Sequence, residues 1–205
     1  MMLIFLAILL LAAALCYPYL SAAISKYRML RRLAGISRSL GFRFRHKGMA
    51  CLSRNRGRQY DLLIENERRI YAVKLWSSYR NGTTLLLGKQ GRVREQRRVV
   101  EPLSVGRKKP YEHRSFALAV PRTRLTLRKN EKRSVTRILL VYPSYREILA
   151  KKEGRVTRLS SGDPIFDKLL YTPSALEQLL CRESEELRAM SADSDSKEKS
   201  QRAAR

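Results

Sequence analysis

YDLLIENERRIYAVKLW, residues 60–76, contains two apolar runs separated by a polar centre. Runs of this kind on either side of a short polar segment predict a β-hairpin. Lys74 interrupts the second run, with Val73 before it and Leu75 after it. Because side chains alternate between the two faces of a strand, Lys74 shares a face with Ala72. The stretch therefore predicts a hairpin that carries an ammonium group on one face.

The turn of this hairpin decides what Lys74 meets. A two-residue turn at 66–67 would pair Asp61 with Ala72 and make Asp61 the diagonal neighbour of Lys74 on one face. A three-residue turn would put Lys74 on the opposite face from Asp61, because a slip of one residue inverts every side chain. Asn-Glu is not the strongest turn signal, so both registers stay open, and so does an edge-protecting strand lysine.

The spacing of an acid and a strand lysine resembles the PD-(D/E)XK nuclease superfamily, which has the restriction-endonuclease-like fold. That family carries an acid on one strand and, after a gap, acid–any residue–lysine on the next. Asp61 matches the first acid, and Ala72-Val73-Lys74 stands where the family has its second acid, spacer and lysine. The resemblance extends in outline over about residues 26–145. It implies a small sheet-and-helix domain that opens with a helix, as the basic segment 26–40 would supply.

The same resemblance implies a site in which two carboxylates hold Mg²⁺ and the lysine assists the nucleophile or the transition state. Ala72 supplies no oxygen for such a hard ion. Glu65 lies about 13–14 Å from Asp61 along an extended strand, and Glu95 would have to come from a neighbouring strand. Asp61 and Lys74 are thus candidate catalytic residues of a degenerate site. Asp61 is a metal ligand, and Mg²⁺ a cofactor, only if the protein is an active enzyme.

Charge is distributed unevenly along the 205 residues. The chain has 43 Lys and Arg against 18 Asp and Glu, which gives a formal net charge of +25. Residues 1–25 carry no charged side chain and residues 182–205 are balanced, so the excess falls on 26–181. A field of this sign attracts polyanions, either nucleic acid or an anionic membrane surface. A merely solvated basic surface is the alternative.

Charge clustering alone selects the candidate nucleic-acid contacts. They are Arg43, Arg45, Lys47, Arg54, Arg56, Arg58, Arg92, Arg94, Arg97, Arg98, Arg107, Lys108, Lys109, Arg122 and Arg124. The three cysteines and two histidines have no disulfide or zinc-ligand spacing, so we expect no structural zinc and a reducing compartment. The common phosphate-loop, dinucleotide, zinc-protease and serine-hydrolase motifs are absent from the sequence.

The N-terminal run MMLIFLAILLLAAALCYPYLSAAIS, residues 1–25, is apolar and uncharged. About 20 such residues span a bilayer as a helix. Four basic residues follow within 26–32, and the positive-inside rule then predicts a single-pass anchor with its N-terminus outside and the domain in the cytoplasm. Pro18 would kink this helix or end it. A cleaved signal peptide is the competing interpretation, although no basic residue precedes the run.

The remaining pattern predicts an α/β or α+β domain. The expected elements are a helix over 26–40 ended by Gly41, the hairpin, strands within 83–100 and at 115–122, a central buried strand at 137–143, a short helix at 145–153, strands within 155–171, and a helix from 172 capped by Thr172 or Ser174. Residues 182–205 have almost nothing to bury and are expected to be a disordered tail.

The chain is therefore divided into a transmembrane anchor, 1–25, a basic domain, 26–181, and the polar tail, 182–205. The favoured function is a membrane-anchored, cytoplasm-facing domain that binds nucleic acid or another polyanion through a nuclease-like core without metal catalysis. Two alternatives stay open. One is an active Mg²⁺-dependent nuclease with a displaced carboxylate. The other is an interaction or scaffold protein that lies on anionic lipid.

Overall fold

The computed structural model describes residues 2–46, 59–77, 83–88, 92–97, 112–120, 123–125, 131–143, 145–152 and 155–203. Within these ranges the side chains of 2–15, 18, 92, 96–97, 112–119, 151–152 and 191–203 are not described. The elements in chain order are α1 (Met2–Ser39), β1 (Arg43–His46), β2 (Leu62–Glu65), β3 (Arg69–Ser77), β4 (Thr84–Leu87), β5 (Arg92–Arg97), β6 (Glu112–Ala119), β7 (Ser134–Tyr142), β8 (Glu147–Lys152), β9 (Arg155–Arg158), β10 (Pro164–Ile165), β11 (Lys168–Tyr171) and α2 (Pro173–Ala203).

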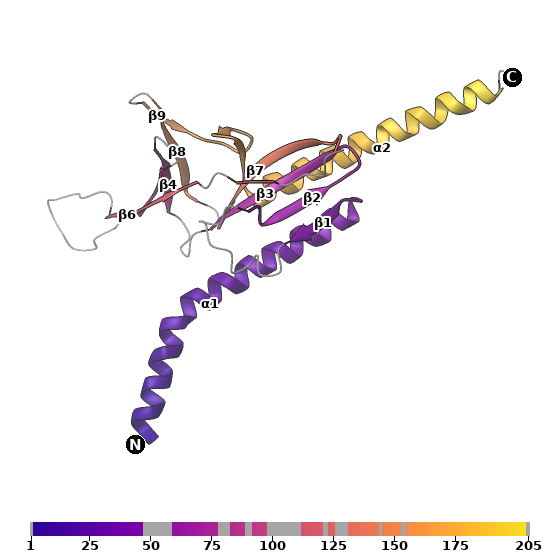
Figure 1. Ribbon diagram of the computed structural model, residues 1–205. Coiled ribbons are helices and arrows are strands. Elements are labelled where there is room, and N and C mark those ends of the chain that lie inside the picture. Colours follow the sequence, from indigo (N-terminus) through magenta and orange to yellow (C-terminus); the bar gives the residue numbers. More distant parts are fainter. Residues whose placement is uncertain are drawn as a thin grey trace.

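The strands form two mixed sheets, so the expected α/β or α+β class is confirmed at that level (Figure 1). The first sheet has the order β1-β2-β3-β7-β11-β10, in which β3, β7 and β11 run parallel. The second has the order β6-β5-β4-β8-β9. As predicted, the apolar run 137–143 is central: β7 lies between β3 and β11, and Ile138 to Val141 are buried.

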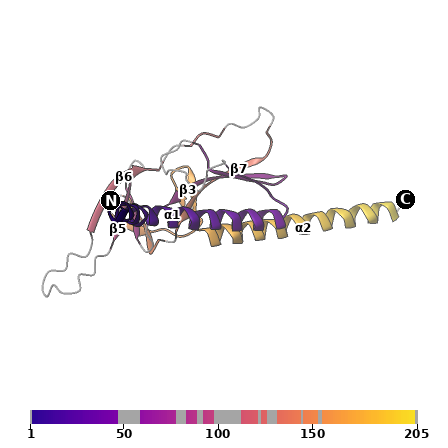
Figure 2. The ribbon, with the colours of Figure 1, turned by 90° about the horizontal axis from the view of Figure 1, so that it is seen from below.

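The two faces of the first sheet pack differently. Tyr71, Val73 and Leu75 of β3 join a core with residues of α1 and α2, so both helices cover this face (Figures 1 and 2). Trp76 of β3 points the other way and joins a core with residues of the second sheet. Lys74 shares this second face because side chains alternate along β3. Tyr71 and Trp76 are almost fully buried, so neither is placed to stack on a base.

The hairpin of β2 and β3 forms as predicted, with a register that differs by two residues. Leu63 pairs with Ala72, and the turn residues are Glu67 and Arg68. Asn66 selects this turn: its Oδ1 accepts the N–H of Arg68 at 2.9 Å, and its own N–H donates to the carbonyl of Arg69 at 3.0 Å. An Asn side chain that bonds its own backbone is typical of such turns. A shift of two residues keeps every side chain on its expected face.

α1 is one helix, whereas the sequence predicted an anchor and then a separate helix. It continues through Pro18 and 25–26 to Ser39, and Figure 1 shows its N-terminal part bending away from the sheets. Among the side chains of α1 that are described, those of Met29, Leu30 and Leu33 in its last half pack on the sheet. In the part of the chain with described side chains, no helix is long and apolar enough to cross a membrane. Most of 1–25 lies outside that part.

Gly41 ends α1, as predicted. Its φ of 85° lies in the left-handed region, which costs glycine little. Phe42 N–H then donates to the carbonyl of Ser37 at 2.8 Å, and Gly41 N–H donates to that of Arg38 at 3.1 Å. This pair of bonds is the Schellman arrangement, and it turns Phe42 into the core.

Two expectations were wrong. The segment expected as a helix at 145–153 contains strand β8. Pairing with β4 and β9 buries Ile148 and Ala150 at a period of two, and this pairing overrides the local helix propensity.

The tail expected to be disordered from 182 is the continuation of α2 to Ala203. Glu183 and Ser184 are buried against the domain, and the residues beyond are rich in the helix formers Glu, Lys, Arg and Ala. Thr172 is the N-cap with Pro173 first in the helix.

Candidate functional site

Asp61 and Lys74 form an ion pair, which is the arrangement expected for a two-residue turn and excludes the three-residue alternative. Lys74 Nζ lies 3.0 Å from Asp61 Oδ2 and donates to the carbonyl of Gln59 at 3.2 Å. The same Asp61 oxygen accepts the backbone N–H of Leu75 at 2.9 Å. Asp61 precedes β2, and its own N–H donates to the carbonyl of Val73. The acid is therefore bonded to three consecutive residues of β3.

The pair is closed to solvent. Lys74 is 0% exposed and Asp61 is 5% exposed. Two charges leave water only when each is paired and hydrogen-bonded, and that is the state of both groups. A lysine that assists a reaction must reach a nucleophile or a substrate. In this conformation Lys74 is held by Asp61 and by backbone instead.

Ala72 occupies the position where the nuclease resemblance requires an acid, and its neighbours are now defined. Leu63 of β2 lies opposite it, and Arg137 of β7 lies beside it in the parallel register. Arg137 is 3.2 Å from the carboxylate of Asp167, which also accepts from Lys168 Nζ at 2.6 Å. The charge next to Ala72 is therefore a cation from β7.

The pKa of Asp167 reflects this arrangement. Burial opposes its ionisation, but the hydrogen bond and charge of Lys168, followed by the charge of Arg137, outweigh burial and hold the pKa of Asp167 below its usual value. Lys168 is itself buried. The three groups thus form a charged cluster whose carboxylate is already shared by two cations.

Neither alternative acid completes a metal site. Glu65 contacts Arg133 and Arg45. Glu95 lies in β5 of the second sheet, where its Oε1 accepts from the hydroxyl of Tyr145 at 3.1 Å. Among the residues whose placement is described, no three His, Cys, Asp or Glu side chains lie together as a metal site. The sequence could not assign Glu95 to a sheet, because that required the pairing of β5.

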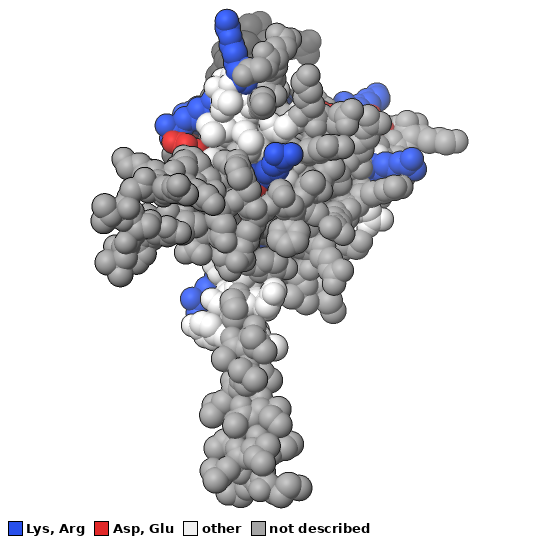
Figure 3. Space-filling view, turned by 90° about the vertical axis from the view of Figure 1, so that its left-hand side faces the viewer, with Lys and Arg blue, Asp and Glu red and all other residues white. Residues whose placement is uncertain are grey.

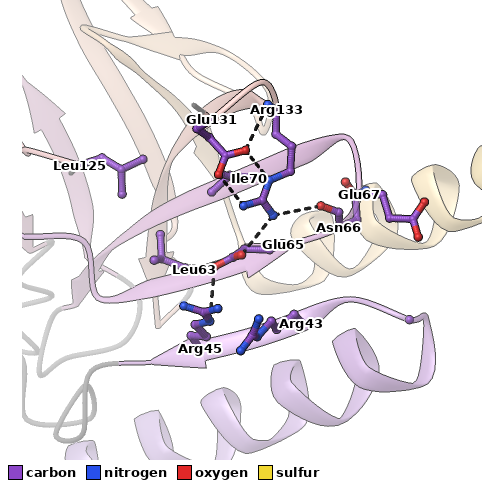
Figure 4. A pocket seen from close by; sticks show the side chains of 11 residues that line it. Arg43, Arg45, Leu63, Glu65, Asn66, Glu67, Ile70, Leu125, Glu131 and Arg133 are labelled. Atoms are coloured by element: carbon purple, nitrogen blue, oxygen red, sulfur yellow. Dashed lines mark hydrogen bonds and ion pairs between the residues drawn. The ribbon is translucent and has the colours of Figure 1, made fainter. Parts of the chain in front are cut away.

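A pocket of about 470 Å³ opens on the same face of the first sheet as Lys74 (Figure 4). Its floor is Leu63 and Ile70, both on the face of Ala72, and Leu125 lies on one side. Leu63 is the cross-strand partner of Ala72, so the floor of the pocket lies next to Ala72. The residues Gly41, Arg43, Arg45, Glu65, Asn66, Glu67, Glu131 and Arg133 complete the lining.

Arg133 is the most extensively bonded residue of the pocket lining. Its Nε and Nη2 donate to the two oxygens of Glu131, each at 2.7 Å. Its Nη1 donates to Glu65 Oε2 at 3.2 Å and to the carbonyl of Asn66 at 3.3 Å. Hydrogen bonding to Glu131, more than to Glu65, raises the pKa of the Arg133 guanidinium above its usual value. This arginine is therefore fixed and neutralised.

Two of the fifteen predicted contact residues meet at the pocket: Arg43 and Arg45, from β1. Arg94 on β5 and Arg124 beside Gln59 are exposed but lie elsewhere. The side chains of the rest lie outside the described residues: Lys47, Arg54, Arg56, Arg58, Arg92, Arg97, Arg98, Arg107, Lys108, Lys109 and Arg122. Figure 3 shows described Lys and Arg side chains at several separate places on one face, with few acidic ones between them.

Sequence reasoning missed the groups that build the pocket and the cluster beside Ala72. Glu131 and Arg133 form an acid–any residue–arginine pair directly before the central strand β7, and that pattern was a readable signal for a structured loop. Asp167 and Lys168 have no comparable signal, because their meeting with Arg137 depends on the parallel pairing of β7 and β11.

Comparison with known proteins adds no relative: no protein-family model matches the chain, and neither a curated protein nor a solved structure matches it significantly.

Proposed function

We propose that the protein is a membrane-anchored, cytoplasm-facing basic domain that binds nucleic acid or a similar polyanion without cutting it. The observation that carries this proposal is the net charge of +25, all of which falls on residues 26–181. Such a field attracts phosphate backbones and makes binding salt-dependent.

We infer that the first sheet is a degenerate form of the nuclease-like core. A helix precedes the hairpin, and an acid and a lysine meet across it, which supports the resemblance. The absence of cleavage rests on Ala72, which offers no ligand, and on Arg137 beside it, whose positive charge disfavours a divalent cation there. Lys74 is already paired with Asp61 away from solvent.

Membrane anchoring by the N-terminal half of α1 is part of the proposal. It rests on the absence of charge in residues 1–25 and on exposed apolar side chains at the end of this run. Tyr17, Leu20, Ile24 and Tyr27 are all at least 45% exposed, and their spacing of three, four and three residues puts them on one side of the helix. Tyrosines suit the interface between lipid and water.

The test uses the full chain in nanodiscs of zwitterionic lipid, titrated against fluorescent DNA and RNA oligonucleotides. We expect the logarithm of the association constant to fall linearly with the logarithm of the salt concentration. Incubation with Mg²⁺ or Mn²⁺ should leave the oligonucleotides intact. Cleavage that Lys74→Ala abolishes would replace this proposal with an active nuclease. Indifference to nucleic acid, together with attachment to anionic vesicles, would support a lipid-bound scaffold instead.

A further inference from the structure

The charges that line the pocket beside Ala72 balance in number, but they are distributed unevenly over its lining. Three arginines and three glutamates line it, but Arg133 takes both oxygens of Glu131 and one oxygen of Glu65. Only Glu65 Oε1 is left for Arg45, and the distance to Arg45 Nε is 3.6 Å. The charges of the lining therefore do not cancel locally.

Arg43 has no ion pair within the described part of the chain, and it is exposed. It lies two residues before Arg45 on β1, so the two side chains leave the same face of the strand about 7 Å apart. Figure 4 shows their guanidinium groups next to each other at the mouth, with Glu67 pointing away from them. Two adjacent like charges that have a single carboxylate between them, itself shared with Arg133, favour an anion beside them.

The inside of the pocket has a different chemistry. Leu63, Ile70 and Leu125 give it apolar walls, while the hydrogen-bonded polar groups of its lining are occupied by one another. The Asn66 amide donates to Glu183 at 2.9 Å and its oxygen accepts from the turn backbone. A ligand that fits is therefore flat or apolar at one end and anionic at the other.

We propose that this pocket holds one nucleotide of a single-stranded nucleic acid, with its phosphate on Arg43 and Arg45 and its base against Leu63, Ile70 and Leu125. Arginine forks match phosphate oxygens, and 470 Å³ is within the usual size of small-ligand sites. No free side-chain donor or acceptor described beside the apolar walls reads the base edge, so binding is tolerant of sequence. Duplex nucleic acid does not fit, because its bases stay stacked and paired. The inference rests on the proposed function and names its ligand.

The experiment compares two double variants of the full chain in zwitterionic nanodiscs, each of which loses two positive charges. Arg43→Gln with Arg45→Gln alters the pocket, while Arg155→Gln with Arg158→Gln removes the same charge from exposed positions on β9. The probe is a fluorescent 12-residue oligothymidine, alone or annealed to its complement. The pocket pair should weaken single-strand binding about tenfold and lower the salt slope by about 1.4, or 0.7 per lost contact. The β9 pair should weaken it less than threefold.

Wild-type protein should also prefer the single strand to the duplex, and the pocket pair should remove that preference. Equal losses in both pairs of variants, with no strand preference, would overturn the pocket assignment while leaving polyanion binding in place. No binding of either oligonucleotide at low salt would overturn both the assignment and the proposed function. Loss of phosphatidylglycerol-vesicle binding in the pocket pair, with oligonucleotide binding unchanged, would assign the arginines to a lipid phosphate and overturn the nucleotide.

Discussion

Arg137 lies beside Ala72 in the parallel register of β7 and β3, so a guanidinium stands next to the position where a nuclease of this design would hold its second carboxylate. Its partner Asp167 is shared with Lys168. A metal ion at this place would therefore meet the cation Arg137 on one side, and both nearby acids, Asp167 and Asp61, are already paired with cations. The surroundings of Ala72, as well as the missing side-chain oxygen, therefore disfavour a metal ion at this position.

The first prediction concerns the buried pair. Lys74→Met leaves the Asp61 carboxylate buried without its cation and should lower the free energy of unfolding by about 3–5 kcal/mol. Urea unfolding of the full chain in non-ionic micelles measures it, with fluorescence of Trp76, the single tryptophan, as the probe. Lys74→Met combined with Asp61→Asn should cost less than Lys74→Met alone. The control is Arg137→Met, whose ion pair is half-exposed and should matter by less than about 1 kcal/mol. If Lys74→Met lowers the free energy of unfolding no more than Arg137→Met does, the buried ion pair of Lys74 and Asp61 is contradicted.

The second prediction concerns Gly41, which ends α1. Gly41→Ala forces a Cβ into the left-handed region and should destabilise the fold by about 1 kcal/mol. Gly35→Ala is the matched control, because Gly35 lies inside α1 with nothing within 4 Å of the added Cβ. That variant should stabilise the protein by up to about 1 kcal/mol. Effects of the same sign in both variants would refute the Schellman end of α1.

The third prediction is a pH dependence. Because the pKa of Asp167 is lowered in the folded state, the stability it contributes is fully present above about pH 3.9, the usual Asp value, and is lost as the pH falls through the lower folded pKa. The side chain is 38% exposed, so solvent screening limits the effect to a fraction of a kcal/mol. Acid titration of stability should therefore be shallower below pH 4 in Asp167→Asn. Identical curves would remove Asp167 from the acid response.

Glu65 provides the fourth prediction, which builds on the nucleotide pocket. Glu65→Gln removes the one carboxylate near Arg45 and should raise single-strand affinity severalfold at low salt, because the mouth gains net charge. It should also cost about 1–3 kcal/mol of stability, since Arg133 loses a charged acceptor. Glu67→Gln makes the same change in net charge, but its side chain points away (Figure 4). Equal gains in affinity would mean that only total charge matters.

Much of the fold was readable because it depends on local alternation. The existence of the hairpin, the central strand β7 and the glycine end of α1 all follow from period and from single residues such as Gly41. The register of the hairpin could not be predicted, because the turn is selected by hydrogen bonds between the Asn66 side chain and its own backbone segment. β8 was misassigned because partners far away in the chain decide its state.

The site followed the same division. Asp61 and Lys74 were found from their spacing on neighbouring strands, and the sequence alone shows that Ala72 offers no acid beside them. Arg137, Asp167 and the pocket under Leu125 were not found, since each depends on segments that the pairing of distant strands brings together. Charge clustering selected Arg43 and Arg45 together with exposed arginines such as Arg94, and it could not show that these two line a pocket.

The continuity of α1 has a mechanical consequence if its first half lies in a bilayer, as we propose. A helix turns about 100° and rises 1.5 Å per residue, and α1 passes from the apolar run into the core with no break before Ser39. The angular phase of the helix would then fix which side of the domain looks toward the lipid. Inserting one alanine after Leu20 would rotate the pocket about the helix axis by about 100°, roughly a quarter turn. Inserting four alanines would return it to nearly its original orientation. The anchor would thus fix the orientation of the domain about the helix axis, which a flexible linker would leave free.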